Sequence, residues 1–183
     1  MNVSNKFMAS FDIISLFTII PINQTIEIIC QQSDLLPLPG PEFKRLLLMC
    51  TMGVRFQFDN TIYRQIDGVA MGSTLSPVLA DIFMSNLGKT KLKHAIDQTT
   101  SYCRYVDDIF VVCNNESHAS YLLRLFNDAH TNVEFTMEHE NDGKFRFLDN
   151  AIQRLVVVSL QRSIYRKPIW NGQYLHFNSF LSK

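Results

Sequence analysis

Two adjacent aspartates, Asp107 and Asp108, lie between the apolar runs Tyr102 to Val106 and Ile109 to Cys113. This pattern is typical of a β-hairpin that carries both carboxylates at its tip. Two like charges repel each other, and each ionised group resists transfer out of water. Divalent cations offset this cost, because Mg²⁺ prefers carboxylate oxygens and substrate phosphates as ligands. The pair therefore indicates metal-dependent phosphoryl transfer, in which two ions roughly 4 Å apart act on one reacting group.

A third acid, Asp12, lies within the apolar segment Phe11 to Phe17. Alone it could serve as a helix or turn cap. Asp12 ends one predicted strand, however, and the acid pair lies at a hairpin tip, so three carboxylates could meet at one edge of a sheet. If instead they lie apart in space, the chain is better explained as a metal-binding α+β domain without this phosphoryl-transfer activity.

The segment Gly68 to Pro77 is a glycine-bounded loop that leads into a helix. Gly72 lets the backbone approach a ligand closely, and Ser73 and Ser76 could hydrogen-bond to phosphate or base edges. An ordinary helix-entry loop would explain the same residues. The order along the chain, with the loop after the first acid and before the acid pair, favours a ligand-binding role.

Hydrophobic periodicity and turn residues predict the elements that position these side chains. Four helices are predicted. The first begins at Ile22, and the second carries the apolar stripe Phe43, Leu46, Leu47 and Cys50. The third runs from Ser76 to about Ala95 with Val78, Leu79, Ile82, Phe83 and Leu87 inward, and the fourth spans Ser117 to His130. The predicted strands, beside the acid-pair hairpin, are Phe7 to Asp12, Val54 to Phe58, Thr61 to Gln65, Val133 to Glu138, Phe145 to Leu148 and Ala151 to Tyr165. This order predicts an α+β fold, an antiparallel sheet with helices packed on one face.

Composition sets the class of protein. The 183 residues, of which 46% are hydrophobic and 19% charged, suit a globular protein of one domain or one and a half, with a proper core. No apolar run reaches the roughly 20 residues of a membrane helix, and the N-terminus does not resemble a signal peptide, so we expect a soluble intracellular protein. Balanced charge, with 17 basic and 17 acidic residues, offers little general affinity for nucleic acid. The scattered cysteines read as free thiols, with a disulfide between Cys103 and Cys113 as the alternative.

Three segments in order, Phe11 to Phe17, Gly68 to Pro77 and Tyr105 to Asp108, resemble the three palm motifs of reverse transcriptases. The resemblance sharpens towards Penelope-like retroelements and spans about residues 8 to 180. The segments that match this group are Ser15 to Thr18 with Ile20-Pro21, Met71 to Ser73 with Leu75 to Pro77, Phe147 to Asp149, Tyr165 to Pro168, and Tyr174 to His176. Thr74 departs from the family pattern, which usually has proline there.

The resemblance implies roles for individual residues. The catalytic and metal-binding acids would be Asp12, Asp107 and Asp108, with Asp108 supporting the other two. Phe17 would block a 2′-hydroxyl and so favour deoxynucleotides. The remaining residues fall into two groups: Met71, Gly72 and Ser73 would contact the incoming nucleotide, and Leu75, Ser76, Pro77 and Tyr105 would line the template and primer path.

Three further candidates lie near the C-terminus. Lys144 would protonate the departing pyrophosphate, as a lysine near this position does in related polymerases, or it is a solvated turn lysine. Arg166 and Lys167 could bind primer phosphates, or they belong to an exposed β-edge. The alternating acids nearby are most simply a solvated strand face: Glu134, Glu138, Glu140 and Asp142.

The resemblance implies an RNA-directed DNA polymerase of a retroelement. Two Mg²⁺ ions, or Mn²⁺, would promote addition of deoxynucleoside triphosphates to a DNA primer on an RNA template, in the nucleus. Residues 1–183 would form the palm with part of the fingers, without counterparts of the N-terminal fingers motifs, the thumb or the endonuclease. The alternative is a degenerate, non-catalytic retroelement fragment.

Overall fold

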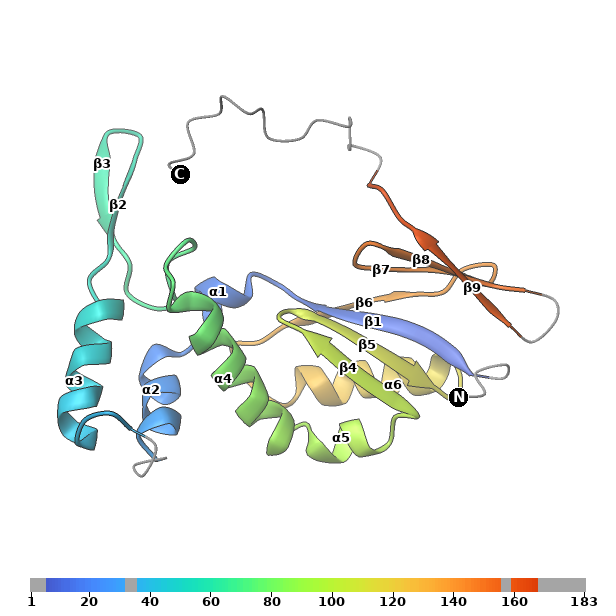
Figure 1. Ribbon diagram of the computed structural model, residues 1–183, viewed down its shortest axis with the longest axis horizontal. Coiled ribbons are helices and arrows are strands. Elements are labelled where there is room, and N and C mark those ends of the chain that lie inside the picture. The colour runs from blue at the N-terminus through green and yellow to red at the C-terminus, as the bar shows by residue number, and fades with distance from the viewer. Residues whose placement is uncertain (1–5, 32–35, 156–158, 168–183) are drawn as a thin grey trace. The chain divides into compact units, whose positions relative to one another are not determined.

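The computed structural model describes residues 6–31, 36–155 and 159–167. They form two compact units, divided between His139 and Glu140. The chain alternates helices and antiparallel strands (Figure 1), so the predicted α+β class is confirmed. Within the described ranges, no helix is long and apolar enough to cross a membrane.

The first unit is built on a four-stranded antiparallel sheet with the order β4-β5-β1-β6. The central strand β1 (Phe7–Ile13) owes its place to alternation, because Ala9, Phe11 and Ile13 are buried while Asp12 faces the opposite side. Its partners are β5 (Asp108–Cys113) and β6 (Phe135–His139), and β4 (Ser101–Tyr105) pairs with β5 at the edge of the sheet.

Helices cover the buried face of this sheet, with α4, α5 and α6 on the same side in Figure 1. Phe126 of α6 packs edge-to-face against Phe11 and Phe135, with ring centroids 5.1 and 5.3 Å apart. The side chain of Asn115 accepts a hydrogen bond from the His118 amide and so caps this helix. The helices in the described part of the chain are α1 (Leu16–Ile19), α2 (Ile22–Cys30), α3 (Gly40–Thr51), α4 (Ser76–Lys89), α5 (Lys93–Asp97) and α6 (Glu116–Asn127).

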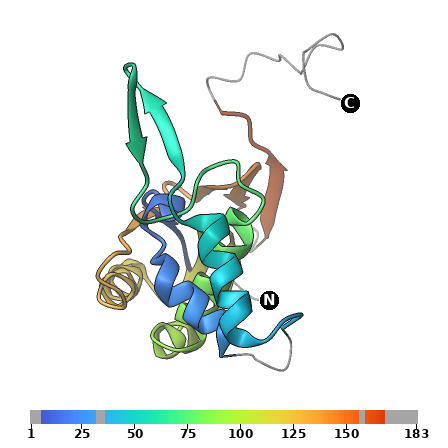
Figure 2. The same cartoon turned by 90° about the vertical axis from the view of Figure 1, so that its left-hand side faces the viewer.

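A separate hairpin joins β2 (Arg55–Phe58) and β3 (Thr61–Arg64), and Figure 2 shows it projecting beyond α3. Its two-residue turn, Asp59-Asn60, is left-handed at both positions, as the favoured hairpin turn requires. The predicted hairpin is therefore confirmed.

The second unit contains the antiparallel strands β7 (Lys144–Phe147), β8 (Asn150–Arg154) and β9 (Leu160–Ile164). The prediction of one strand over Ala151 to Tyr165 is wrong, because β8 and β9 pair with each other. The prediction that Glu140 is solvated is also wrong. Its side chain, 11% exposed, receives two hydrogen bonds from the Arg154 guanidinium at 2.6 and 2.9 Å.

Some predictions for the helices α3 and α4 of the first unit are wrong. The helix at Ser76 ends at Lys89 instead of near Ala95, because the Leu92 amide donates to the Leu87 carbonyl at 2.9 Å and the chain turns. This turn buries Leu92, the residue that immediately precedes α5. Leu46 and Cys50 belong to the apolar stripe predicted for α3, and Val78 was predicted to point inward from α4. All three side chains are exposed.

The cysteines of the described residues are all free thiols, as predicted. The alternative disulfide is wrong because the strand register places Cys103 opposite Phe110, while Cys113 is opposite Phe7 on the other neighbouring strand. Burial raises the pKa of the Cys113 thiol to about 11.

Candidate functional site

The first acid and the acid pair meet where β1 and β5 lie side by side. Phe11 is opposite Ile109 in this antiparallel pairing, and both side chains are buried towards the helices. Asp12 and Asp108 each lie one residue away from this pair, so alternation directs them to the opposite face of the sheet. Asp107 lies in the two-residue turn that joins β4 to β5.

Electrostatics show that Asp12 and Asp107 are close. Burial is the main cause that raises the pKa of Asp12, followed by the negative charge of Asp107 and, more weakly, that of Glu138. The backbone amide of Ile13 opposes this rise by a hydrogen bond to the carboxylate. The ionised pair is therefore a repulsive arrangement that a bound cation would relieve.

Two interacting carboxylates, of which Asp107 lines a cavity, fit Mg²⁺, because this ion keeps several water or phosphate ligands in addition to one or two protein carboxylates. Among the described residues, no three side chains of the types His, Cys, Asp and Glu are arranged to hold a metal ion together. Asp12 and Asp107 interact electrostatically, and their role as metal ligands is a prediction. A metal-binding role for Asp108 stays a prediction.

The acid turn is strained at Val106, which has a φ of 54°. Val106 occupies the first position of a two-residue hairpin loop, because Tyr105 pairs directly with Asp108. Glycine is the usual residue for left-handed backbone in such loops, and a β-branched side chain there is a genuine outlier that costs about 1–3 kcal/mol. Strain of this size persists only where neighbouring groups hold the backbone in place.

A cavity of about 560 Å³ adjoins the acid turn. Its volume falls in the range of sites that bind small molecules. It joins residues from α1, the glycine loop, the start of α4 and the acid turn: Ser15, Leu16, Phe17, Met71, Gly72, Ser73, Ser76, Pro77 and Asp107. The structure thus brings all four predicted nucleotide-binding residues together with Asp107.

Backbone contacts fix the glycine loop against α1. The amide of Val69 donates to the carbonyl of Phe17 at 2.7 Å. Gly68, at a φ of 72°, packs so tightly that an added Cβ would lie 2.4 Å from the carbonyl oxygen of Thr18. Both the positive φ and the lack of room for a Cβ therefore require glycine at this position. The close contact sets the distance between Phe17 and the loop.

The loop also closes on itself before the helix begins. Ser76 Oγ donates to the carbonyl of Ala70 at 2.6 Å, and the amide of Ser73 donates to the same carbonyl at 3.1 Å. Pro77 suits the first turn of α4, where its missing amide proton is not needed. Ser73, Ser76 and Pro77 are thereby held along one wall of the cavity.

Other predicted site residues lie outside this cavity. Leu75 lines a small neighbouring cavity of about 20 Å³, and Tyr105 is 63% exposed at the end of β4. Lys144, Arg166 and Lys167 are exposed residues of the second unit. Two segments of the resemblance, Pro168 and Tyr174 to His176, fall outside the described residues.

Sequence reasoning gave no role to Ser15 and Leu16, which also line the cavity. Ser15 has a φ of 55° and precedes α1, which places Phe17 beside the loop. Neither residue type is unusual in an apolar segment. The one available signal was their position between Asp12 and Phe17.

The fold is similar to parts of two yeast telomerase structures. Against the apo telomerase of Candida tropicalis truncated at its C-terminal domain, the TM-score is 0.64 at 14% identity, covering 86% of this chain and 35% of that one. Against the telomerase of Candida albicans in complex with a fragment of telomeric RNA, it is 0.68 at 11% identity, covering 90% of this chain and 32% of that one. The chain spans about a third of the length of these proteins.

Sequence comparison gives a more specific result. No curated protein shows significant similarity to the chain. The family model described as reverse transcriptase (RNA-dependent DNA polymerase) matches residues 2–161, which include the acids, the glycine loop and the cavity wall. The chain therefore belongs to the reverse transcriptase family.

Proposed function

We propose that this chain is the palm of an RNA-directed DNA polymerase that adds deoxynucleotides to the 3′-hydroxyl of a primer. The observation that carries this proposal is the cavity in which Asp107 lies beside Phe17 and the loop Met71 to Ser73. Family membership supplies the class of reaction, and the cavity supplies a place for the nucleotide.

Asp12 and Asp107 would hold the divalent ions, Mg²⁺ or Mn²⁺, with Asp108 in a supporting role. Their fit rests on two carboxylates that repel each other and raise the pKa of Asp12. Bound divalent ions supply Lewis acidity for phosphoryl transfer. The chain's own part would be to hold Asp107 at the cavity and Asp12 on the neighbouring strand β1, where the two charges interact.

The nucleotide would lie between α1 and the glycine loop. The Phe17 ring would occupy the space that a 2′-hydroxyl requires, which favours deoxynucleotides. Gly72 has no atom within 4 Å of the place where a Cβ would be, so its backbone can approach the base or sugar. Met71 and Ser73 would complete the contacts on the same side.

Template and primer would pass beside this cavity. Ser76 and Pro77, with Leu75 in the adjoining cavity, would line the template, and the exposed Tyr105 would support the primer terminus. Arg166 and Lys167 would bind primer phosphates, and Lys144 would act as the general acid for pyrophosphate. An origin in a Penelope-like retroelement and a location in the nucleus belong to the same proposal and rest on the sequence motifs alone.

Primer extension tests the proposal in the full-length polypeptide that carries these residues. A labelled DNA primer on an RNA template should be extended only with divalent metal present. Asp107→Asn should lower the rate roughly thousandfold, since metal ions supply several kcal/mol of transition-state stabilisation. Asp97→Asn is the matched control, because Asp97 is exposed on α5, and it should extend normally. Normal extension by folded Asp107→Asn would refute the assignment.

A further inference from the structure

We propose that Arg104 is a positioning residue of the polymerase site, which holds the acid turn Tyr105 to Asp108 at a fixed place relative to α4. The proposal rests on the polymerase function proposed above. The hydrogen bonds of Arg104 to Val106, Asp81 and Ser85 reach no residue that lines the cavity, so its effect would reach the reaction through Val106 and the adjacent Asp107.

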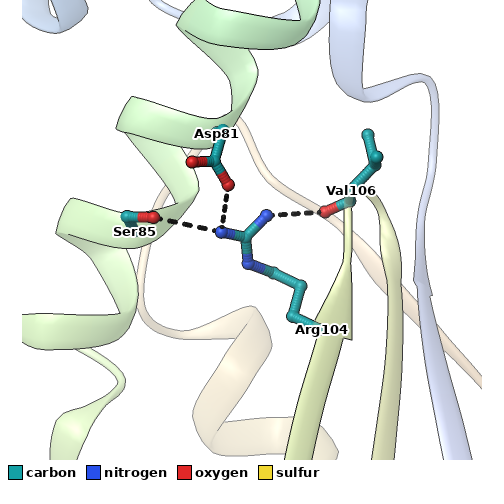
Figure 3. Close-up of polar contacts among 4 residues, drawn as sticks. All are labelled: Asp81, Ser85, Arg104 and Val106. Carbon is teal, nitrogen blue, oxygen red and sulfur yellow. Dashed lines mark hydrogen bonds and ion pairs between the residues drawn. The ribbon is translucent and has the colours of Figure 1, made fainter.

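The Arg104 guanidinium joins two elements through different nitrogens (Figure 3). Nη1 donates to the carbonyl of Val106 at 3.0 Å. Nη2 donates to the Asp81 carboxylate at 2.7 Å and to the Ser85 hydroxyl at 3.1 Å, both on α4. A planar guanidinium holds several donors in a fixed geometry, so it can link a turn and a helix as a rigid bracket.

The burial of the pair is uneven. The Arg104 side chain is 14% exposed, whereas that of Asp81 is 67% exposed. A surface carboxylate in this setting adds little stability by itself. The contacts of the cation with the carbonyl of Val106 and with the hydroxyl of Ser85 are both more sheltered than its contact with Asp81. Val106 is the one residue of the acid turn with left-handed backbone. Arg104 therefore binds the carbonyl of the residue whose backbone is strained.

The hydrogen bond from Arg104 accounts for the persistence of the strained backbone at Val106. Relaxation of Val106 towards ordinary negative φ would rotate its carbonyl away from Arg104 and would displace Asp107, the next residue. The hydrogen bond from Arg104 opposes this relaxation. Without it, the turn can visit conformations in which the Asp107 carboxylate leaves the cavity.

The contacts of Arg104 with α4 connect it to a second part of the cavity. Asp81 and Ser85 lie on the helix that begins with Ser76 and Pro77, which line the same cavity as Asp107. Arg104 thus ties the acid turn to the helix whose first turn lines the same cavity. Its loss should alter the alignment of reacting groups more than the overall fold, and misplacement by about 1 Å can lower a rate by roughly 10²-fold.

The test compares steady-state primer extension by the full-length polypeptide and its Arg104→Met variant. The expected result is a kcat lower by roughly 10²-fold with a nearly unchanged KM for the deoxynucleotide. Arg124→Met is the matched control, an exposed arginine of α6, and should keep both constants. Arg104→Lys retains the charge without the planar donors and should remain closer to Arg104→Met than to the parent.

Several outcomes would overturn the proposal. One is an unchanged kcat in Arg104→Met. Another is a loss of thermal stability with a normal kcat in the folded fraction, which would indicate a merely structural role. A third is a large rise in KM alone, which would indicate direct contact with the nucleotide. Full activity in Arg104→Lys would show that charge suffices and would exclude the bracket.

A crystal structure of Arg104→Met gives a readout that does not depend on activity. Val106 is expected to leave the left-handed region and the acid turn to move away from α4. If Val106 keeps its φ near 54° and the turn its place, the positioning role is wrong. Absence of extension in the parent protein would refute the polymerase function instead, so the two failures are distinct.

Discussion

The charge of Asp107, in the turn between β4 and β5, raises the pKa of Asp12 at the end of β1. Only burial raises it more. Two strands that are far apart in sequence are thereby paired so that their carboxylates repel. Such repulsion weakens the metal-free fold, and it is expected where a site is shaped for a cation instead of for stability.

Replacement of Asp12 by asparagine should stabilise the metal-free protein at neutral pH. A raised pKa means that folded Asp12 holds its proton more tightly than the unfolded chain does. Its favourable contribution is thus complete below the ordinary value of 3.8 and is lost as the pH rises through the raised value. Urea unfolding in a chelator at several pH values measures this effect.

The gain in Asp12→Asn should therefore be largest near neutral pH and shrink as the solution is acidified. Added Mg²⁺ should stabilise the parent protein and not the variant, since the ion requires the carboxylate. Asp59→Asn, in the exposed turn of the β2–β3 hairpin, is the control. A variant less stable than the parent at neutral pH would contradict the repulsion.

Phe17→Val should admit ribonucleotides. The smaller side chain leaves room for a 2′-hydroxyl in the cavity, so the preference for deoxynucleotides should fall by roughly 10–100-fold. The ratio of kcat/KM for the two sugars measures it in primer extension. Phe58→Val makes the same change at an exposed position of β2 and should keep the ratio. An unchanged ratio in Phe17→Val would exclude this residue as the sugar selector.

Gly68→Ala should destabilise the first unit more than Gly53→Ala. Both glycines have a positive φ, 72° and 79°, but only at Gly68 would a Cβ clash, 2.4 Å from the Thr18 carbonyl oxygen. The backbone conformation costs about 1–2 kcal/mol in either variant, and the clash should add about 1–3 kcal/mol. Urea denaturation measures the difference. Equal losses would show that the contact with Thr18 is not tight.

Glu140→Gln should loosen the second unit. The Glu140 and Arg154 side chains are 11% and 21% exposed, so loss of the carboxylate leaves a sheltered cation without its charged partner. The expected loss is about 2–4 kcal/mol, seen as faster amide hydrogen exchange in β7 and β8. Asp97→Asn, which breaks an exposed pair with Lys93, should have almost no effect. Unchanged exchange in Glu140→Gln would contradict this role.

Local patterns allowed most elements to be predicted. Alternation in Phe7 to Asp12 and turn residues at Asp59-Asn60 depend on near neighbours, and both predictions were confirmed. The break after Lys89 could not be predicted, because it depends on burial of Leu92 against a core assembled from distant segments. For the same reason, the pairing of Glu140 with Arg154 was not visible in a stretch of alternating acids.

The candidate site was partly predictable. Residue types and their order identified Asp107 and the glycine loop, and the resemblance to reverse transcriptases added Phe17 and Met71. The fold brings these residues to one cavity. Arg104 gave no such signal, since an arginine in a strand reads as solvated. Its contacts with α4 depend on how β4 packs against that helix, which no short segment of sequence specifies.

Location of the metal ions is the most direct test. Crystals of the full-length polypeptide with primer, template, deoxynucleotide and Mn²⁺ should show anomalous scattering from ions bound by the carboxylates of both Asp12 and Asp107, with the nucleotide beside Phe17. Ions bound elsewhere, or no ions at these two aspartates in a protein that still extends primers, would contradict the proposed site.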